Sequence, residues 1–349
     1  MTNSPPAPSL AIKTETQPAE SQTAALPTRD GLVLRVDSGL YIVHADPDKN
    51  NSVQRVVCRL RGNLRKNLTF SAAEGLPRRV IRAKRPPTTD VVAVGDRVRF
   101  TPIDSGNGII EEVYPRESHF SRSSFRGREQ TLLTNLDQLV IVFACAEPNP
   151  DLWRLDRWLA CAEYCGLGSL IVANKRDRVD DAAFRDRFAE FSDIGCRVIE
   201  TSAKSGLGIE ALRSALHGCI SAFTGPSGVG KSSLLNALQP GLKLAIGDVG
   251  EVTFKGRHTT TVRELIPLEC GGWVADTPGL RQLDLLTMSR DELLACFVEF
   301  PAVLETPCRF RNCRHENEPG CALKAAVAAG AISARRYESF LQLAAQTAG

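Results

Sequence analysis

The stretch Gly225-Pro226-Ser227-Gly228-Val229-Gly230-Lys231-Ser232 fits the pattern G-x-x-x-x-G-K-[S/T], and the rest of the chain is organised around it. Residues 219–224 before it are mostly apolar and predict a short buried strand, while residues 233–238 predict the start of a helix. In such a strand–turn–helix unit, glycines let backbone N–H groups point inward, and the helix dipole attracts negative charge. The stretch therefore predicts a phosphate-binding loop that extends to Ser233, in the first turn of the helix.

Two side chains at the end of this loop have specific expected roles. Lys231 is expected to reach the β- and γ-phosphates of a nucleotide, and the Ser232 hydroxyl is expected to bind Mg²⁺. A chance glycine-rich turn is the alternative interpretation. It does not explain why a strand pattern precedes the motif and a helix pattern follows it.

Length and composition set the general class of protein. The 349 residues leave room for two or three domains, and 43% of them are apolar. No apolar run approaches 18 residues, so no membrane span is expected. Residues 1–29, rich in Pro, Ser, Thr and Ala, predict a disordered tail and not a secretory signal. Eleven cysteines without such a signal are expected to be reduced, which favours a cytoplasmic protein and argues against a disulfide framework.

Short strands and glycine turns fill the region from residue 30 to about residue 115. This pattern, without a clear helix, predicts a small β-barrel, and an OB-fold is the natural candidate. The expected strands are 32–36, 40–43, 53–60, 91–94, 97–100 and 108–113.

Basic residues are concentrated in one part of this barrel. Between Val53 and Arg85, Glu74 is the only acid. The basic residues there are Arg55, Arg59, Arg61, Arg65, Lys66, Arg78, Arg79, Arg82, Lys84 and Arg85. A barrel with a basic flank favours binding to a nucleic-acid backbone. The alternative is a solvated surface whose charge is neutralised by acidic neighbours from elsewhere in the chain.

The sequence pattern changes after a basic linker at residues 116–128. Apolar strands are expected at 138–144, 169–173 and 196–200, and helices at 152–164, 182–191 and 208–216. Alternation of buried strands and helices predicts a parallel, doubly wound sheet with helices on both faces.

Two of these strands end in motifs suited to a guanine base. Asn174-Lys175-Arg176-Asp177 follows the pattern N-K-x-D, and the Asp177 carboxylate can accept from both N1–H and the N2 amino group of guanine. Asn174 is expected to brace the loop, and the Lys175 stem to lie on the base. Ser202-Ala203-Lys204 ends the next strand, where backbone N–H groups could contact the guanine O6. Adenine offers no such donor pair, so an ATP-dependent kinase or ATPase is disfavoured.

The γ-phosphate is expected to meet two further loops. Thr259 or Thr260, at the end of a glycine-rich segment from Leu242 to Arg257, could offer a hydroxyl to Mg²⁺ and an N–H to the γ-phosphate. Alternatively, these threonines merely open a strand from residue 261 to 268. In Asp276-Thr277-Pro278-Gly279, Asp276 would hold Mg²⁺ through water, and the Gly279 N–H would contact the γ-phosphate.

The residue after this second loop is Leu280, which cannot orient an attacking water as a glutamine does in many GTPases. His258 is the nearest polar candidate for that role. The alternative is a solvated loop histidine.

The order of the motifs differs from the usual one. A usual GTPase has the phosphate loop first and N-K-x-D later, whereas here N-K-x-D precedes the phosphate loop. This order predicts a circularly permuted domain, which a parallel sheet tolerates because domain termini lie close together. The expected domains are a tail at 1–29, an OB-fold at 30–115, the permuted domain at 116–290 and a last domain at 291–349.

The last domain carries Cys308-x4-Cys313-x-His315-x5-Cys321. Three cysteines and one histidine at this spacing predict a tetrahedral, structural Zn²⁺ site with one ion per chain. The alternative is reduced cysteines beside a chance histidine. Residues 322–345 predict one or two alanine-rich helices broken near Gly330.

Together, the permuted order, the run Gly256-Arg257-His258-Thr259-Thr260-Thr261 and the cysteine–histidine spacing resemble one family over residues 30–345. It is the family of circularly permuted, ribosome small-subunit-dependent GTPases of bacteria. The resemblance implies an OB-fold, a permuted GTPase and a zinc domain. It also implies late maturation of the small ribosomal subunit as the role, binding to its rRNA, and His258 as the residue implicated in hydrolysis.

Two hypotheses for function follow. The first is a GTPase checkpoint enzyme that uses GTP with Mg²⁺, acts as a monomer away from membranes and is stimulated by the small subunit. The second is a GTP-gated rRNA-binding protein whose slow hydrolysis is incidental, which Leu280 makes plausible. They differ in whether ribosome binding raises turnover.

Overall fold

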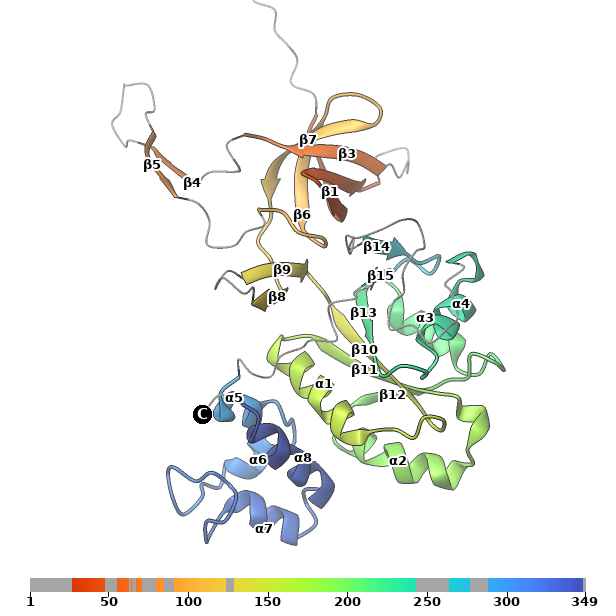
Figure 1. Ribbon diagram of the computed structural model, residues 1–349, viewed down its shortest axis with the longest axis vertical. Coiled ribbons are helices and arrows are strands. Elements are labelled where there is room, and N and C mark those ends of the chain that lie inside the picture. The colour runs from red at the N-terminus through yellow and green to blue at the C-terminus, as the bar shows by residue number, and fades with distance from the viewer. Residues whose placement is uncertain are drawn as a thin grey trace, which may run out of the picture.

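The computed structural model describes residues 27–47, 55–62, 64, 67–70, 80–84, 91–123, 129–242, 264–276 and 288–347. Three bodies follow one another along the chain in Figure 1: a β-barrel at the top, a sheet flanked by helices in the middle and a small helical body below. Most of the predicted N-terminal tail lies outside the described residues. Among the described helices, none is both long and apolar enough to cross a membrane.

The N-terminal barrel confirms the predicted OB-fold. Its strands are β1 (Arg29–Asp37), β2 (Leu40–Ala45), β3 (Arg55–Leu60), β6 (Arg97–Pro102) and β7 (Asn107–Val113). They pair in the order β1-β2-β3-β7-β6, and β1 also pairs with β6, which closes the barrel. Only the β3–β7 pair is parallel. The barrel core includes Val33, Val43, Val56, Phe100 and Ile110, because apolar residues alternate along these strands.

Residues 91–94, predicted as a strand, form a buried turn instead. The Asp96 carboxylate accepts the Ala93 N–H at 2.7 Å and binds Arg116 through two contacts of 2.8 Å. A buried carboxylate with these partners bends the chain, which apolar composition alone did not reveal.

The basic linker predicted at 116–128 also contains regular structure. Strands β8 (His119–Ser123) and β9 (Glu129–Thr134) form an antiparallel hairpin. The Thr134 N–H donates to the Val94 carbonyl, so the hairpin adjoins the buried turn. A second hairpin, β4 (Asn67–Phe70) with β5 (Val80–Lys84), pairs with no other described strand.

The central domain is a mainly parallel sheet, as predicted. Its strands are β10 (Gln138–Ala144), β11 (Gly168–Asn174), β12 (Arg197–Glu200), β13 (Ile220–Thr224), β14 (Glu264–Pro267) and β15 (Trp273–Asp276). The order is β12-β11-β10-β13-β15-β14, and only β14 runs antiparallel to its neighbour β15. Strand β13, which leads into the phosphate loop, therefore lies in the middle of the sheet, between β10 and β15.

Helices cover both faces of this sheet. Alternate residues of β10 supply the two sides: Ile141 and Phe143 face one hydrophobic cluster, and Val140 and Val142 face the other. The first cluster includes residues of α1 (Leu152–Tyr164) and α2 (Asp181–Asp193). The second includes residues of α3 (Ile209–Leu216) and α4 (Lys231–Leu238).

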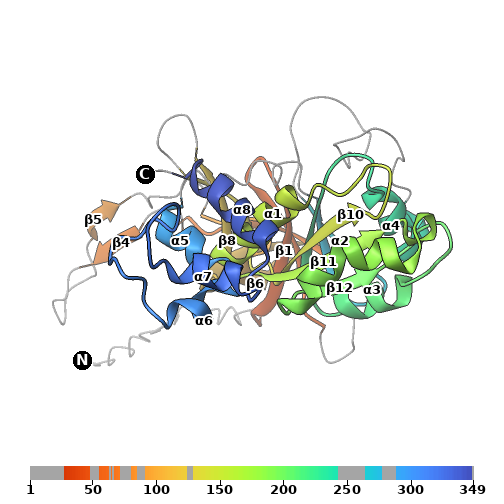
Figure 2. The ribbon, with the colours of Figure 1, turned by 90° about the horizontal axis from the view of Figure 1, so that it is seen from below.

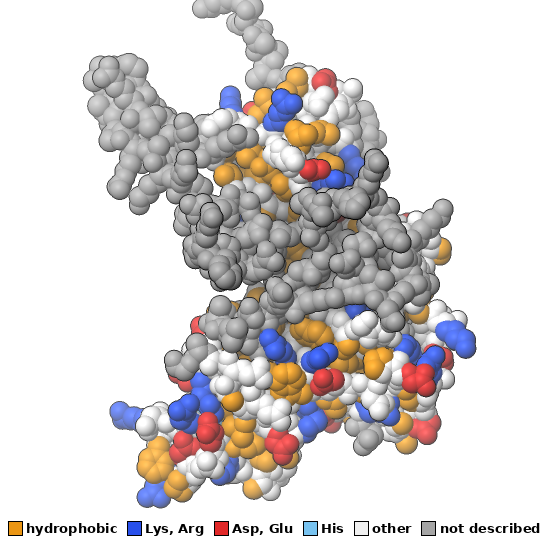
Figure 3. Space-filling view, viewed as in Figure 1, with side chains coloured by type: hydrophobic (Ala, Val, Ile, Leu, Met, Phe, Trp, Pro, Cys, Tyr) orange, Lys and Arg blue, Asp and Glu red, His pale blue; other side chains and the backbone are white. Residues whose placement is uncertain are grey.

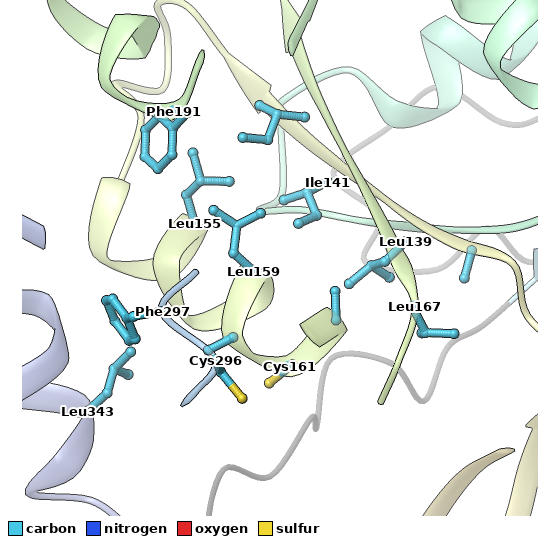
Figure 4. Packing of buried hydrophobic residues seen from close by; sticks show 14 of the residues in the cluster. Leu139, Ile141, Leu155, Leu159, Cys161, Leu167, Phe191, Cys296, Phe297 and Leu343 are labelled. Atoms are coloured by element: carbon cyan, nitrogen blue, oxygen red, sulfur yellow. The ribbon is translucent and has the colours of Figure 1, made fainter. Parts of the chain in front are cut away.

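The C-terminal body consists of helices α5 (Arg290–Ala295), α6 (Phe300–Leu304), α7 (Ala322–Ala328) and α8 (Ala334–Ala344). The helix break predicted near Gly330 is present between α7 and α8. Figures 1 and 2 both place this body beside α1. Leu155 and Leu159 of α1 share one buried cluster with Phe297 and Leu343, so the two domains have a common core (Figure 4).

Polar contacts fix the same boundary. Asp156 of α1 is fully buried and binds Arg335 at 2.6 Å and Arg336 at 2.7 Å, both from α8. Arg336 also holds Glu299 through two hydrogen bonds of 2.8 Å. A buried ion cluster of this kind tolerates little displacement, because separating the charges would leave them unpaired away from water.

The barrel and the central sheet are joined by strand pairing. β1 pairs antiparallel with β14, with Arg35 opposite Glu264, so strands of both domains form one continuous eleven-stranded sheet. His44 of β2 also lies edge-on against Trp273 of β15, with ring centroids 4.7 Å apart.

Candidate nucleotide site and metal centre

The phosphate loop connects β13 to α4 as its sequence predicts. Gly225 and Gly230 have φ values of +142° and +95°, a region that favours glycine. A Cβ at Gly225 would lie 2.1 Å from the Val142 carbonyl oxygen, and one at Gly230 would lie 2.4 Å from Asn174 Nδ2. The loop thus fits against two neighbouring strand ends only because these positions have no side chain. Its backbone forms a cradle at a helix N-terminus, which suits phosphate.

The Lys231 side chain forms hydrogen bonds with the phosphate loop. Its Nζ donates to the carbonyl oxygens of Gly225 and Pro226, both at 2.7 Å. Ser232 and Ser233 follow in the first turn of α4 and are half-buried, whereas Ser227 and Gly228 at the loop tip are exposed and Val229 is buried. The amino group therefore lies over the mouth of the loop, beside the helix N-terminus.

Asn174 connects three loops. Its Nδ2 donates to the Val229 carbonyl of the phosphate loop at 2.8 Å. Its Oδ1 accepts the Ala203 N–H at 3.2 Å and the Thr201 hydroxyl at 3.3 Å. Asn174 is 2% exposed, so this bracing role, predicted from the sequence, uses a buried amide with both ends satisfied.

The Asp177 carboxylate is exposed and held from one side. The Ser202 hydroxyl donates to its Oδ1 at 2.6 Å, and the Ser205 N–H donates to the Ser202 oxygen at 3.1 Å. The N-K-x-D motif and the Ser202-Ala203-Lys204 motif are therefore linked through a side chain. Sequence reasoning assigned Ser202 only a backbone role, and nothing in the spacing of the motifs indicated this hydroxyl contact. Lys204 is exposed on the same loop.

The loop after β10 lies beside the N-K-x-D loop, a contact that the sequence did not predict. Lys175 has a left-handed backbone (φ +60°), and its Nζ donates to the Glu147 carbonyl. Arg178 forms an ion pair with the Glu147 carboxylate. A Cβ at Gly228 would lie 3.8 Å from Pro148 Cδ. Residues 147–148 therefore lie between the N-K-x-D loop and the tip of the phosphate loop.

Arg176, predicted among the nucleotide-binding residues, has its guanidinium engaged within the protein. It binds Glu200 at 2.6 Å, pairs with Asp181 and lies over the Phe184 ring at 4.9 Å. Its backbone N–H donates to the Thr201 carbonyl at 3.0 Å. The side chain thus supports the loop from behind.

The motif Asp276-Thr277-Pro278-Gly279, predicted to contact the γ-phosphate, begins at the end of β15. Asp276 is the last residue of that strand, and β15 runs parallel to β13 with Ala275 opposite Ala222. The strand ends that carry Asp276 and the phosphate loop are therefore adjacent. The predicted residues His258, Thr259, Thr260, Gly279 and Leu280 lie outside the described residues.

The four residues predicted to bind metal do gather. One ligand atom from each of Cys308, Cys313, His315 and Cys321 lies within 4.8 Å of the others. His315 Nδ1 is 3.4 Å from the Cys321 sulfur and 3.6 Å from the Cys308 sulfur. Of all eleven free cysteines, only these three take part in such a cluster among the described residues. Three thiolates and an imidazole match the donor set of a closed tetrahedral zinc site.

The surroundings of the cluster hold its shape. His315 has φ +61°, and its carbonyl accepts from the Tyr337 hydroxyl of α8. The Ala322 N–H donates to the Cys308 sulfur at 3.2 Å, so the backbone of α7 fixes one of the four ligand atoms. Burial raises the pKa of the Cys313 thiol, and hydrogen bonds with the Cys321 and Cys308 sulfurs act in the same direction. Three sulfurs and one imidazole nitrogen within 4.8 Å of one another fit a divalent metal.

Comparison with known proteins agrees with this arrangement. The family model of the RsgA GTPase matches residues 113–286. The protein named Small ribosomal subunit biogenesis GTPase RsgA from Moorella thermoacetica is 41% identical over 91% of this chain and 97% of its own. The protein of the same name from Gemmatimonas aurantiaca is 44% identical over 72% of this chain and 83% of its own.

Solved structures extend the likeness to the whole fold. The crystal structure of YjeQ from Thermotoga maritima has a TM-score of 0.70 at 31% identity and covers 92% of this chain and 98% of its own. The structure titled YloQ, a circularly permuted GTPase, has a TM-score of 0.69 at 27% identity, with 93% and 96% covered. The permuted motif order and these long, similar relatives lead to one conclusion: the chain belongs to the RsgA GTPase family and hydrolyses GTP.

Proposed function

We propose that this protein binds the small ribosomal subunit, assists its late maturation and hydrolyses GTP to GDP and phosphate faster when bound there. The names of its relatives at 41% and 44% identity support the ribosomal part. One observation supports the proposed binding of guanine nucleotide: buried Asn174 links the phosphate loop to the two loops proposed to bind the base. GTP would thus bind to three loops that Asn174 holds together. The protein would act in the cytoplasm of a bacterium.

The phosphates would be held by the loop backbone and by Lys231. On binding, the Lys231 amino group would exchange the carbonyls of Gly225 and Pro226 for the β- and γ-phosphate oxygens. Ser232, in the first turn of α4, and Asp276, at the end of β15, are suited to hold Mg²⁺, which would neutralise developing charge on those oxygens. The site residues thus position the substrate and stabilise charge, which is most of what phosphoryl transfer requires.

The base would be selected by Asp177. Its carboxylate is exposed on one side and fixed by Ser202 on the other, so it can accept two guanine donors without reorganising. Lys204 would present its backbone N–H to the guanine O6, while Ala203 would hold the loop in place through its N–H bond to Asn174. The Lys175 stem would lie against the base plane. Arg176 is proposed to act only through its backbone.

The residues proposed to act in hydrolysis are those that the sequence predicts. Thr259 or Thr260 would bind Mg²⁺ and the γ-phosphate, and the Gly279 N–H would sense the same phosphate. His258 would orient the attacking water, because Leu280 has no hydrogen-bonding group. The His258→Ala variant is expected to bind GTP normally and to lose stimulated turnover. Equal stimulated turnover would remove His258 from the reaction.

Ribosomal RNA would be contacted by the barrel and by the metal-held segment. On β3, Arg55 and Arg59 are exposed and form no ion pair among the described residues. Near the cluster of cysteines, Arg309 and Arg311 are exposed beside Phe310, which is 41% exposed. On the described part of the face in Figure 3, basic and acidic side chains are interspersed, which favours several small contacts over one basic groove. The remaining basic residues predicted at 53–85 lie outside the described side chains, apart from exposed Arg61, which pairs with Glu111.

The metal cluster would hold one structural zinc ion, and the protein would act as a monomer. All four ligands come from the chain, which leaves no open position for substrate. The ion would shape residues 308–321, which contain few apolar residues to build a core of their own.

The second hypothesis, a GTP-gated binder with incidental hydrolysis, makes a different prediction for one experiment. GTP turnover is measured with the purified protein alone and with small subunits, large subunits or naked RNA. A large rise with small subunits only is expected. No rise with any of them would overturn the checkpoint enzyme and favour the binder.

A further inference from the structure

We infer that Arg35 of the barrel, together with Glu264, is a positioning pair for Asp276 in GTP hydrolysis. The inference rests on the proposed role of Asp276 as the residue that holds Mg²⁺. It adds a residue from the N-terminal domain to a reaction otherwise assigned to the GTPase domain.

The first observation is the register of three strands from two domains. Glu264 of β14 lies opposite Arg35 of β1 on one side and opposite Asp276 of β15 on the other. One row of residues thus crosses from the barrel to the end of the strand that carries Asp276. Residues directly opposite each other in neighbouring strands are in contact. Displacing Arg35 is therefore expected to displace Glu264, and through it Asp276.

The second observation is that β14 meets the two domains unequally. It contains four residues, Glu264–Pro267, and all four pair with β15. Its pairing with β1 is a single register position, Arg35 with Glu264. Among the described residues, this position is therefore the one strand pairing by which the barrel holds the outer neighbour of β15.

The third observation is that β1 is shared between two cores. Val33 faces the barrel core, whereas Leu32 and Leu34 belong to the cluster that also contains Leu265 and Ala275. A register irregularity between Val33 and Arg35 interrupts the β1–β2 pairing at this point. Such a bulge redirects the following side chain, and here that side chain is Arg35.

The contacts of Arg35 leave one donor available. Its Nη2 binds Asp37 at 3.1 Å, and its Nη1 is 3.9 Å from a Glu264 carboxylate oxygen. Its Nε is buried and has no hydrogen-bond partner among the described residues. A buried donor of this kind is uncommon and is stabilised when an acceptor approaches. A closer Glu264 carboxylate would satisfy it, so the pair can tighten from 3.9 Å.

The experiment uses charge reversal in the full chain. The variants are Arg35→Glu, Glu264→Arg and the double swap, with Arg61→Glu as a matched control. Arg61 follows β3 in the same barrel and pairs with Glu111 of β7, and neither of these strands pairs with a strand of the central domain. Turnover is measured without ribosomes, as kcat and KM for GTP. Metal binding is measured separately, from the electron paramagnetic resonance of Mn²⁺ with a non-hydrolysable GTP analogue.

Each single reversal is expected to lower kcat and weaken Mn²⁺ binding about fivefold, because like charges then face each other at the Arg35–Glu264 position. The KM for GTP at saturating metal should stay within about twofold, since the base and phosphate contacts lie on other strands. The double swap should recover part of both quantities, because it restores opposite charges at that position but leaves a positive charge opposite Asp276. Arg61→Glu should resemble the unaltered protein, and a simple loss of folding would lower all quantities together.

The inference is overturned if the single reversals bind Mn²⁺ as the unaltered protein does, or if the double swap is as impaired as they are. The Asp276→Asn variant separates this failure from failure of the proposed site. Weak Mn²⁺ binding by Asp276→Asn with normal single reversals refutes only the positioning pair. Normal Mn²⁺ binding by Asp276→Asn refutes the assignment of Asp276, and the positioning pair with it.

Discussion

The hydroxyl of Ser202 donates a hydrogen bond to the Asp177 carboxylate across 2.6 Å. Asp177 is exposed, and Ser202 is fully buried, so a buried side chain fixes an exposed one at the base site. A carboxylate that is already oriented loses less conformational freedom on binding, and this favours affinity.

Replacing this hydroxyl should therefore weaken guanine nucleotide binding. Ser202→Ala is expected to raise the Kd for GDP about tenfold, because hydrogen bonds to a charged group contribute about 1.5 kcal/mol. Titration with a fluorescent GDP analogue measures the change. Ser192→Ala, at an exposed position of α2, is the control. An unchanged Kd for Ser202→Ala would show that Asp177 needs no support.

The carboxylate itself should determine which base is bound. Asp177→Asn is expected to shift preference from guanine toward xanthine nucleotides, because an amide can donate to the extra oxygen of xanthine but cannot accept two N–H groups. Competition of GDP and XDP for the same site measures the shift. Unchanged GDP affinity would remove Asp177 from the base site.

The metal centre can be tested by metal content. Cys308→Ser should lose about one zinc ion per chain and loosen the helical body, because three remaining ligands cannot close the tetrahedron. Elemental analysis with protease sensitivity measures both effects. Cys270→Ser, a half-buried cysteine outside the cluster, should keep its zinc. The absence of zinc from the unaltered protein would refute the site.

The contact between barrel and central sheet should weaken in acid. Burial, and then the nearby charge of Arg55, lower the pKa of His44 below its usual 6.5. The unfolded chain therefore takes up this proton first as pH falls, so stability is full above about pH 6.5 and declines below it. The fall in melting temperature from pH 7.5 to 5.5 should be smaller in His44→Gln. An identical fall would exclude His44 as a source of acid sensitivity.

The buried ion cluster should be sensitive to loss of one member. Arg336→Ala leaves Glu299 without its bidentate partner and Asp156 with only Arg335, at an expected cost of about 3 kcal/mol. Calorimetry should show melting about 5–10 °C lower. Arg154→Ala, which removes an exposed pair with Asp151, should change melting by less than about 2 °C. Equal shifts in the two variants would contradict the importance of the cluster.

Much of the fold could be predicted because its signals are local. Helix 152–164 and strand 138–144 were predicted with the boundaries that the structure shows, since long apolar runs and clear periodicity determine them. The cysteine cluster could also be predicted, because four ligands of the right chemistry lie within 14 residues. The motif order alone indicated the permutation. The sheet order agrees with it, because β13, which leads into the phosphate loop, lies in the middle of the sheet beside β10 although it comes late in the sequence.

The failures arise from contacts between distant residues. Residues 91–94 look like a strand, but Asp96 and Arg116 bend them into a turn. The Ser202–Asp177 bond, the Lys175–Glu147 contact and the Arg35–Glu264 row each join separate loops or domains. None of them leaves a periodic pattern in the sequence, so only a structure brings them together. Helices α5 and α6 are short, which explains why no prediction was made for them.

The shared core beneath α1 has a practical consequence for dissecting the molecule. The family model ends at residue 286, before the helices that cover Leu155, Leu159 and Phe191. A fragment cut there would expose these side chains to water and leave Asp156 without either arginine. Such fragments are expected to aggregate when expressed alone, since large uncovered apolar patches promote association. The segment by which this family is identified is therefore shorter than the smallest piece of chain that should fold by itself.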